Sequence, residues 1–212
     1  MLADGWQAQR PHDDLPGQGI QTAWSFLGRW PCNSFTKTDD ATILEKRRAM
    51  KSSNDKALSH IVKRALSGEG AHAGTRNVFD GLDWRVAAMQ PPGVPHSIFQ
   101  LLAHITYWQN WVLQWLDAED PAVPRHAAGS WPSNPGPASS DEWKLAVRSF
   151  RVSLDKLERR SSQGDLLGAI GKTSRLRMFH TIASHNSYHI GQVVILRQLL
   201  GKWPPPSGGL TW

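Results

Sequence analysis

The stretch TSRLRMFHTIASHNSYHIGQVVILRQLL, residues 173–200, reads as one long helix that carries two histidines four positions apart. A threonine or serine caps its start, and Gly201 followed shortly by three prolines ends it. His185 and His189 both fall on the apolar face of this helix, one turn apart and pointing the same way. Two imidazoles placed in this way can bind one metal ion. A third ligand from a neighbouring helix would complete a metal site.

A second apolar helix is predicted from Ser97 to about Asp117, because Ser97 and Gln100 have the spacing of a capping box. Its inward stripe includes His104. Buried histidines are uncommon unless their ring nitrogens are satisfied, and three inward imidazoles satisfy one another poorly. A divalent cation would satisfy all three, and three neutral histidines with an open position are typical of a hydrolytic metal centre. Ordinary core or cleft histidines remain the alternative.

The rest of the chain supplies two more main helices. Apolar side chains share one face over residues 54–66, and a further helical piece is expected over residues 71–82. Ser139 and Glu142 form another capping box, which starts a helix that runs to about Arg160. The four main helices predict an all-α fold, an antiparallel four-helix bundle with a long crossover connection through the loop rich in Pro, Gly and Ser after the second helix.

Residues 1–49 differ from the remainder in composition. They contain several prolines and glycines and show no sustained periodicity, which predicts a poorly ordered N-terminal extension with at most a short helix over Ile43–Met50. A sharper hypothesis places the natural start of the protein at Met50. The bundle is then expected to occupy residues 50–212.

The composition favours a protein of the cytoplasm. No apolar run approaches the roughly 18 residues that span a bilayer, so no membrane association is expected. The N-terminus lacks a basic stretch followed by an apolar one, which argues against a secretory signal. Cys32 is the single cysteine, so an internal disulfide is impossible, as is usual in a reducing compartment.

The net charge of +6 invites a nucleic-acid interpretation. The densest basic runs are Lys46-Arg47-Arg48 with Lys51, and Arg159-Arg160. Aromatic residues do not interleave with these runs, and the sequence contains no recognisable DNA-binding motif. We therefore expect these basic residues to form a solvated surface, and we expect no specific nucleic acid as a partner.

Several catalytic motifs are absent from the sequence. The glutamate of the HExxH metalloproteases is replaced by Asn186, which disfavours that mechanism. The chain contains no GxSxG elbow, no glycine-rich phosphate loop and no cysteine placed beside a catalytic histidine. The remaining histidines are expected to lie away from the site, on the surface or in helix packing: His12, His60, His72, His96, His126 and His180.

The histidine motifs make the chain resemble a known family, the DinB/YfiT-like metalloenzymes, over about residues 54–206. The resemblance is most specific in the last helix, where HNSYHIGQ opens into VVILR, residues 185–197. It is moderate around Leu102-Ala103-His104 in the tryptophan-rich second helix. The loop PPGVPHS, residues 91–97, and the tail LGKWPPP, residues 200–206, also look like this family.

The resemblance implies a four-helix bundle of DinB/YfiT type with an unusual crossover. It implies that the metal ligands are His104, His185 and His189, with zinc or nickel as the usual divalent ion. Better-known relatives are transferases that use bacillithiol, or the mycothiol-dependent maleylpyruvate isomerase. Others are damage- or stress-inducible proteins without an assigned reaction. A homodimer through helix faces is also implied.

The leading hypothesis is a metal-dependent enzyme that activates a bound water or a low-molecular-weight thiol against a small-molecule substrate, as a hydrolase or thiol S-transferase. The alternative is a non-catalytic metal-binding protein of the stress or damage response, and charge alone suggests a third, a nucleic-acid-associated factor. No general base is assigned, although three polar residues are candidates. Gln192 is a candidate for orienting a ligand. The polar candidates are Tyr107, Asn186 and Tyr188. Trp108, Trp111 and Trp131 could wall a pocket, and core packing is the role expected first for them.

Overall fold

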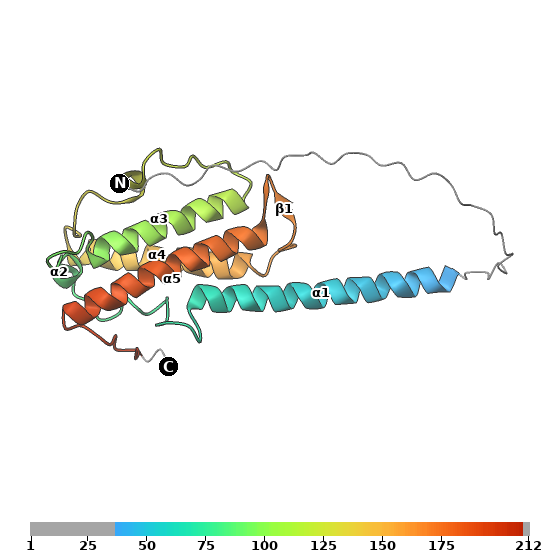
Figure 1. The fold of residues 1–212 in the computed structure, drawn as a ribbon, viewed down its shortest axis with the longest axis horizontal. Helices are drawn as coiled ribbons and strands as arrows, with labels where there is room; N and C mark the ends of the chain where they lie inside the picture. Colours follow the sequence, from blue (N-terminus) through green and yellow to red (C-terminus); the bar gives the residue numbers. More distant parts are fainter. Residues whose placement is uncertain (1–36, 210–212) are drawn as a thin grey trace, which may run out of the picture.

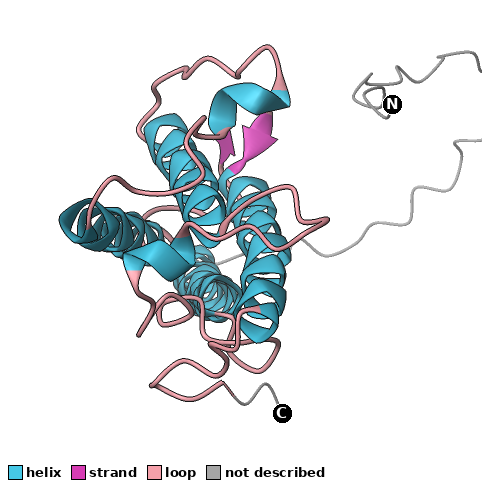
Figure 2. Cartoon of the chain, turned by 90° about the vertical axis from the view of Figure 1, so that its left-hand side faces the viewer, coloured by secondary structure: helices cyan, strands magenta, loops and turns pink. Residues whose placement is uncertain are grey.

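The computed structural model describes residues 37–209, and over these residues the chain is a bundle of long helices with one small hairpin (Figures 1 and 2). The predicted all-α class is confirmed. The elements are α1 (Lys37–Ser67), α2 (Trp84–Ala87), α3 (Ile98–Leu116), the 3-10 helix η1 (Ala127–Ser130), α4 (Ser140–Arg160), β1 (Ala169–Ile170), β2 (Thr173–Ser174) and α5 (Arg175–Leu199).

The three predicted caps start the three helices of the bundle body. The Ser97 hydroxyl accepts from the Gln100 backbone N–H while the Gln100 side chain accepts from the Ser97 N–H, which completes the capping box of α3. The hydroxyls of Ser139 and Ser174 likewise accept from the backbone N–H groups of Glu142 and Arg177 at the starts of α4 and α5. The reciprocal bond of a capping box is absent at α4, because the Glu142 side chain accepts from the N–H of Ala138 instead. These side chains satisfy backbone donors that the first turn leaves without partners, so the helix starts are fixed locally.

The long helices form two parallel pairs. Arg160 at the end of α4 donates to the carbonyl of Leu116 at the end of α3, so α3 and α4 run in the same direction. Helices α1 and α5 run the opposite way and pack together, while α3 contacts both α4 and α5 (Figure 1). Two parallel neighbours in sequence need a connection that returns along the bundle, which is the role of residues 117–139. The predicted bundle with a long crossover is confirmed, and the crossover makes α3 and α4 parallel neighbours within it.

Helix α1 is longer than the sequence analysis predicts. It begins at Lys37, so residues 37–49 of the expected extension are helical and the expected boundary at residue 50 lies within a continuous helix. The physical reason is that residues 37–67 contain no glycine or proline to interrupt the backbone hydrogen bonds. Residues 1–36, which hold the rest of that extension, lie outside the described part of the chain.

The expected helical piece over residues 71–82 is instead a series of turns. Gly70 and Gly81 adopt positive φ angles of 75° and 69°, which L side chains rarely adopt and which no helix contains. The apolar side chains of this segment still enter the core, because Val78 and Phe79 are buried. Arg197 of α5 donates from Nη1 to two backbone carbonyls here, those of Val78 and Asp80, each at 3.0 Å. The segment is thus held by tertiary contacts.

The short strands β1 and β2 form a two-stranded antiparallel hairpin in which Ala169 pairs with Ser174. None of the helices within residues 37–209 is long and apolar enough to cross a membrane.

Candidate metal centre

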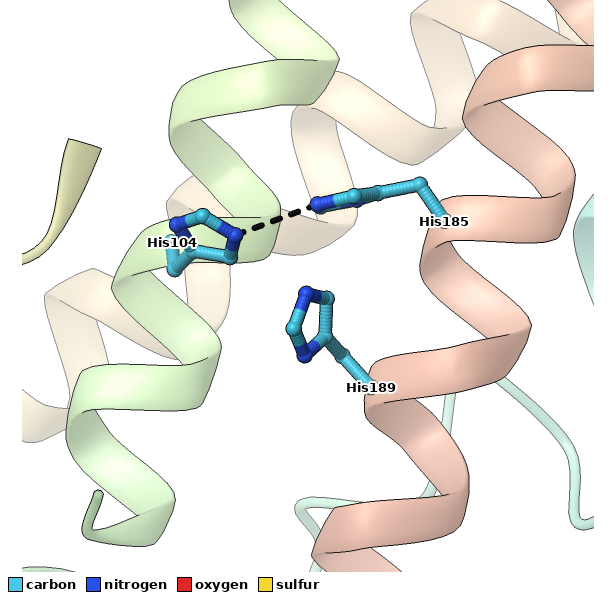
Figure 3. A group of neighbouring side chains, drawn as sticks. All are labelled: His104, His185 and His189. Atoms are coloured by element: carbon cyan, nitrogen blue, oxygen red, sulfur yellow. Dashed lines mark hydrogen bonds between the residues drawn. The ribbon is translucent and has the colours of Figure 1, made fainter. Parts of the chain in front are cut away.

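Three histidines from two helices converge inside the bundle (Figure 3). His104 projects from α3, and His185 and His189 project from successive turns of α5. One ring nitrogen from each lies within 4.8 Å of those of the other two. His104 and His189 are each 6% exposed, and His185 is half-buried. The grouping that the sequence predicted is therefore present, and it places the three rings where one metal ion can be held.

Antiparallel packing of α3 on α5 brings the rings together. The centroids of the His185 and His189 rings lie 4.5 Å apart, as expected for positions i and i+4 of one helix. The His104 ring lies 5.0 Å from His185 and 4.7 Å from His189. One ring of α3 thus faces both rings of α5, and the three nitrogens enclose a small polar space.

Hydrogen bonds on the outer nitrogens fix the orientation of two rings. His104 donates from Nδ1 to the carbonyl oxygen of Ser130, at 3.2 Å. His189 donates from Nδ1 to Oε1 of Gln192, at 2.6 Å. These oxygens are acceptors only, so both Nδ1 atoms carry the proton and both Nε2 atoms carry a free lone pair. This is the arrangement that metal-binding histidines adopt, and it gives Gln192 the orienting contact anticipated from its position.

The inward nitrogens fit a divalent cation. Nε2 of His104 and Nε2 of His185 lie 3.1 Å apart (Figure 3). Two nitrogen ligands of a tetrahedral zinc ion lie about 3.3 Å from each other. Two lone pairs directed at each other repel, whereas a shared cation attracts both. Without an ion, His185 can relieve this contact by donating its own Nε2 proton to His104.

Burial keeps the cluster neutral. Desolvation, followed by the neighbouring histidines, lowers the pKa of His104 to about 4 and that of His185 to about 3. Desolvation also lowers the pKa of His189, partly offset by its bond to Gln192. Unprotonated imidazole is the form that binds metal, so the lone pairs are available throughout the physiological pH range.

The crossover loop covers one side of the cluster with an aromatic stack. The Trp131 indole lies flat between two imidazoles, 3.8 Å from the His104 ring and 3.7 Å from the His96 ring. Trp108 meets His104 and His185 edge-on, at 6.4 and 6.2 Å. These two indoles lie against the cluster, and both also pack against the hydrophobic core. Trp111 instead donates from Nε1 to the carbonyl of Pro121.

The sequence predicted that His96, which precedes a helix cap, would lie away from the site. The stacking of His96 on Trp131 was not predicted. No periodicity carries that signal, because the partner, Trp131, comes from a loop 35 positions later. In the sequence His96 precedes the second helix and Trp131 follows it, and the returning crossover loop is what brings the two rings together. Ser130, whose backbone carbonyl orients His104, was missed for the same reason.

The other polar candidates lie at the edge of the cluster. Asn186 is 1% exposed, and its side chain interacts with His185, where it opposes the lowering of the pKa by burial. Tyr188 is 66% exposed, and its ring meets that of His189 edge-on at 4.9 Å. Tyr107 packs against Trp108 at the surface. His72 bonds to Ser187, on another side of α5. His60, His126 and His180 are exposed, and His12 lies outside the described residues.

A protein-family model matches the part of the chain that carries the three histidines. The model of the DinB superfamily matches residues 68–193, more than half of the chain, so the protein belongs to the DinB superfamily. The matched region includes all three histidines and begins just after α1. No curated protein and no solved structure matches the chain.

Proposed function

We propose that His104, His185 and His189 hold one divalent metal ion and that the protein is a metal-dependent enzyme acting on a small molecule. The observation that carries this proposal is the 3.1 Å approach of two Nε2 atoms, with the outer nitrogen of the His104 ring already donating to a carbonyl. Membership of the DinB superfamily supports the same ligand set. Zinc or nickel is the ion we expect.

The residues of the chain prepare the site before any ion binds. Ser130 and Gln192 hold two rings with their Nε2 atoms inward, and burial keeps the imidazoles neutral. Trp108 and Trp131 limit the access of bulk water. Three protein ligands leave a position open, and a cation there supplies the Lewis acidity that activates a water or a low-molecular-weight thiol near neutral pH. The reaction is then hydrolysis or thiol S-transfer.

A second candidate is a non-catalytic metal-binding protein of the stress or damage response. The burial of His104 and His189 favours it, because an enclosed ion is less accessible to a substrate. The two candidates differ in one physical property. An enzyme needs a coordination position that exchanges with small molecules, whereas a structural site is closed by its ligands.

Substitution with Co²⁺ tests that property, because the visible spectrum of cobalt reports its coordination. We expect a low-molecular-weight thiol, and separately azide, to change the spectrum of the cobalt-loaded protein with saturation. The His185→Ala variant should not give the starting spectrum. A cobalt-loaded protein whose spectrum stays constant during both titrations would support the non-catalytic candidate. Protein that changes its spectrum should next be screened for turnover with thiols and electrophiles.

A further inference from the structure

The net charge of the chain is concentrated on one half of α1. Between Lys46 and Arg64 there are seven basic residues and one acidic residue, so these nineteen positions carry +6. The whole chain also carries +6, so the remainder is neutral overall. From the sequence these cations look scattered, because serine, alanine and apolar residues separate them. One continuous helix gathers them along about 27 Å, at 1.5 Å per residue.

This part of α1 forms one wall of a groove of about 690 Å³, where the helix runs out past the end of the bundle (Figure 1). Arg48, Lys56 and Lys63 line the α1 side. Within the described residues, neither Lys56 nor Lys63 makes an ion pair with a carboxylate. Lys51 also lines the groove, and it is paired with Asp165 at 2.9 Å. The lining includes one carboxylate, Asp55, against the four cations Arg48, Lys51, Lys56 and Lys63, so the groove keeps a net positive charge.

The opposite wall is made of small polar groups. The turn that follows α4 contributes Ser161, Ser162 and Gly164. The Ser162 hydroxyl is hydrogen-bonded to that of Ser59 on α1 at 2.9 Å, which joins the two walls at the base of the groove. Hydroxyls and lysines are the groups that contact phosphate oxygens in protein–nucleic acid complexes. The lining residues include no Trp, Tyr or Phe on which a base could stack, although the exposed imidazole of His60 lies among them. They also include no large apolar side chain that could enter a lipid layer.

We propose that this groove binds the phosphodiester backbone of nucleic acid without reading its bases. A small anion would need two or three cations at one point, whereas these cations extend along a helix for the length of several nucleotides. Contacts to phosphate alone give affinity that is independent of sequence and falls steeply with salt. The proposal does not depend on the metal centre, because α1 precedes the residues that match the DinB superfamily.

The test uses the full chain and a labelled 20-nucleotide DNA, with binding followed by fluorescence anisotropy at 50 mM salt. Lys56→Glu/Lys63→Glu reverses two groove cations. Lys144→Glu/Arg148→Glu changes the net charge equally on an exposed part of α4, away from the groove. Circular dichroism should confirm that both variants are folded. We expect the groove variant to bind about tenfold or more weakly, with a smaller dependence on salt, and the control to change by less than about threefold.

Four results would overturn the proposal. Equal loss in both double variants would mean that only the overall charge matters. Retained affinity in the groove variant would place any binding elsewhere on the chain. Binding of wild-type protein to vesicles of anionic phospholipid, but not to the oligonucleotide, would make the groove a membrane contact instead. A homopolymer of thymidine should bind as tightly as a mixed sequence, and a tenfold preference would contradict readout of the backbone alone.

Discussion

Trp131 lies flat on the ring of His104, with the two ring centroids 3.8 Å apart and the planes inclined by 5°. The two residues come from different elements, since Trp131 belongs to the crossover loop and His104 to α3. The preceding residue of the loop, Ser130, accepts the hydrogen bond from Nδ1 of the same histidine. The crossover therefore does more than connect two parallel helices, because it holds one of the three rings in place.

Replacing Trp131 should weaken the metal site. A stacked aromatic pair contributes about 1 kcal/mol beyond the area it buries, which corresponds to roughly fivefold in affinity. We expect Trp131→Ala to lower zinc affinity by about that factor or more, and Trp131→Phe, which retains a stacking ring, to change it less. Competition with a coloured chelator measures both. Equal affinities for the alanine variant and the wild type would mean that the stack does not brace His104.

Gln192 should act on the metal through His189. Its Oε1 accepts the Nδ1 proton of that ring at 2.6 Å, and loss of such an outer partner typically costs about 10- to 100-fold in metal affinity. We expect Gln192→Leu to lose metal affinity by a factor in this range. Gln192→Glu retains an acceptor and should bind metal nearly as well as the wild type. If both variants lose metal to the same extent, packing rather than hydrogen bonding is the function of this residue.

Arg197 should anchor the irregular segment that precedes α2. It is 2% exposed and its guanidinium satisfies the carbonyls of Val78 and Asp80. Arg197→Met leaves both carbonyls without a donor, at a cost of about 3 kcal/mol in the free energy of unfolding. Urea denaturation measures this, with Arg177→Met on the exposed side of α5 as the control. Equal stability of the two variants would show that the segment is held by its apolar side chains alone.

The stability of metal-free protein should fall in mild acid. Burial lowers the pKa of His104 to about 4 and that of His185 to about 3, both below the ordinary 6.5. Between pH 4 and pH 6.5 these histidines are protonated in the unfolded chain but not in the folded chain. Their contribution to the free energy of unfolding is therefore complete above pH 6.5 and is lost as the pH falls towards 4. Each such histidine contributes a slope of about 1.4 kcal/mol per pH unit.

Urea denaturation at pH 7 and pH 5, after treatment with a chelator, measures this slope. His104→Gln removes one of the groups and should reduce the difference in the free energy of unfolding between the two pH values. The carboxylates contribute equally to both proteins, so the comparison isolates the histidine. An identical pH dependence in the variant and the wild type would contradict the buried, neutral state of the cluster.

The helix starts and the three histidines could be predicted because their signals are local. Ser97, Ser139 and Ser174 each satisfy a backbone N–H three residues on, and the histidines follow helical periodicity. Gln192 was within reach for the same reason, since it lies three positions after His189. Short-range geometry thus predicted the helix starts and the grouping of the three histidines.

The remaining features depend on contacts that no short window of sequence contains. The parallel course of α3 and α4 is set by a loop whose Pro135 carbonyl accepts from Ser97, 38 positions away. That contact also places Trp131 and, through it, His96. The start of α1 was missed for a different reason, because its low apolar content hid a stretch without glycine or proline that favours a helix.

Metal content of the purified protein tests the central claim most directly. Elemental analysis should find about one equivalent of zinc or nickel in the wild type, and less than about a tenth of that in His185→Ala and His189→Ala. His60→Ala, on the exposed side of α1, is the matched control and should retain the metal. Circular dichroism should show that all three variants stay helical. Unchanged metal in either His185→Ala or His189→Ala would contradict the assignment of the site.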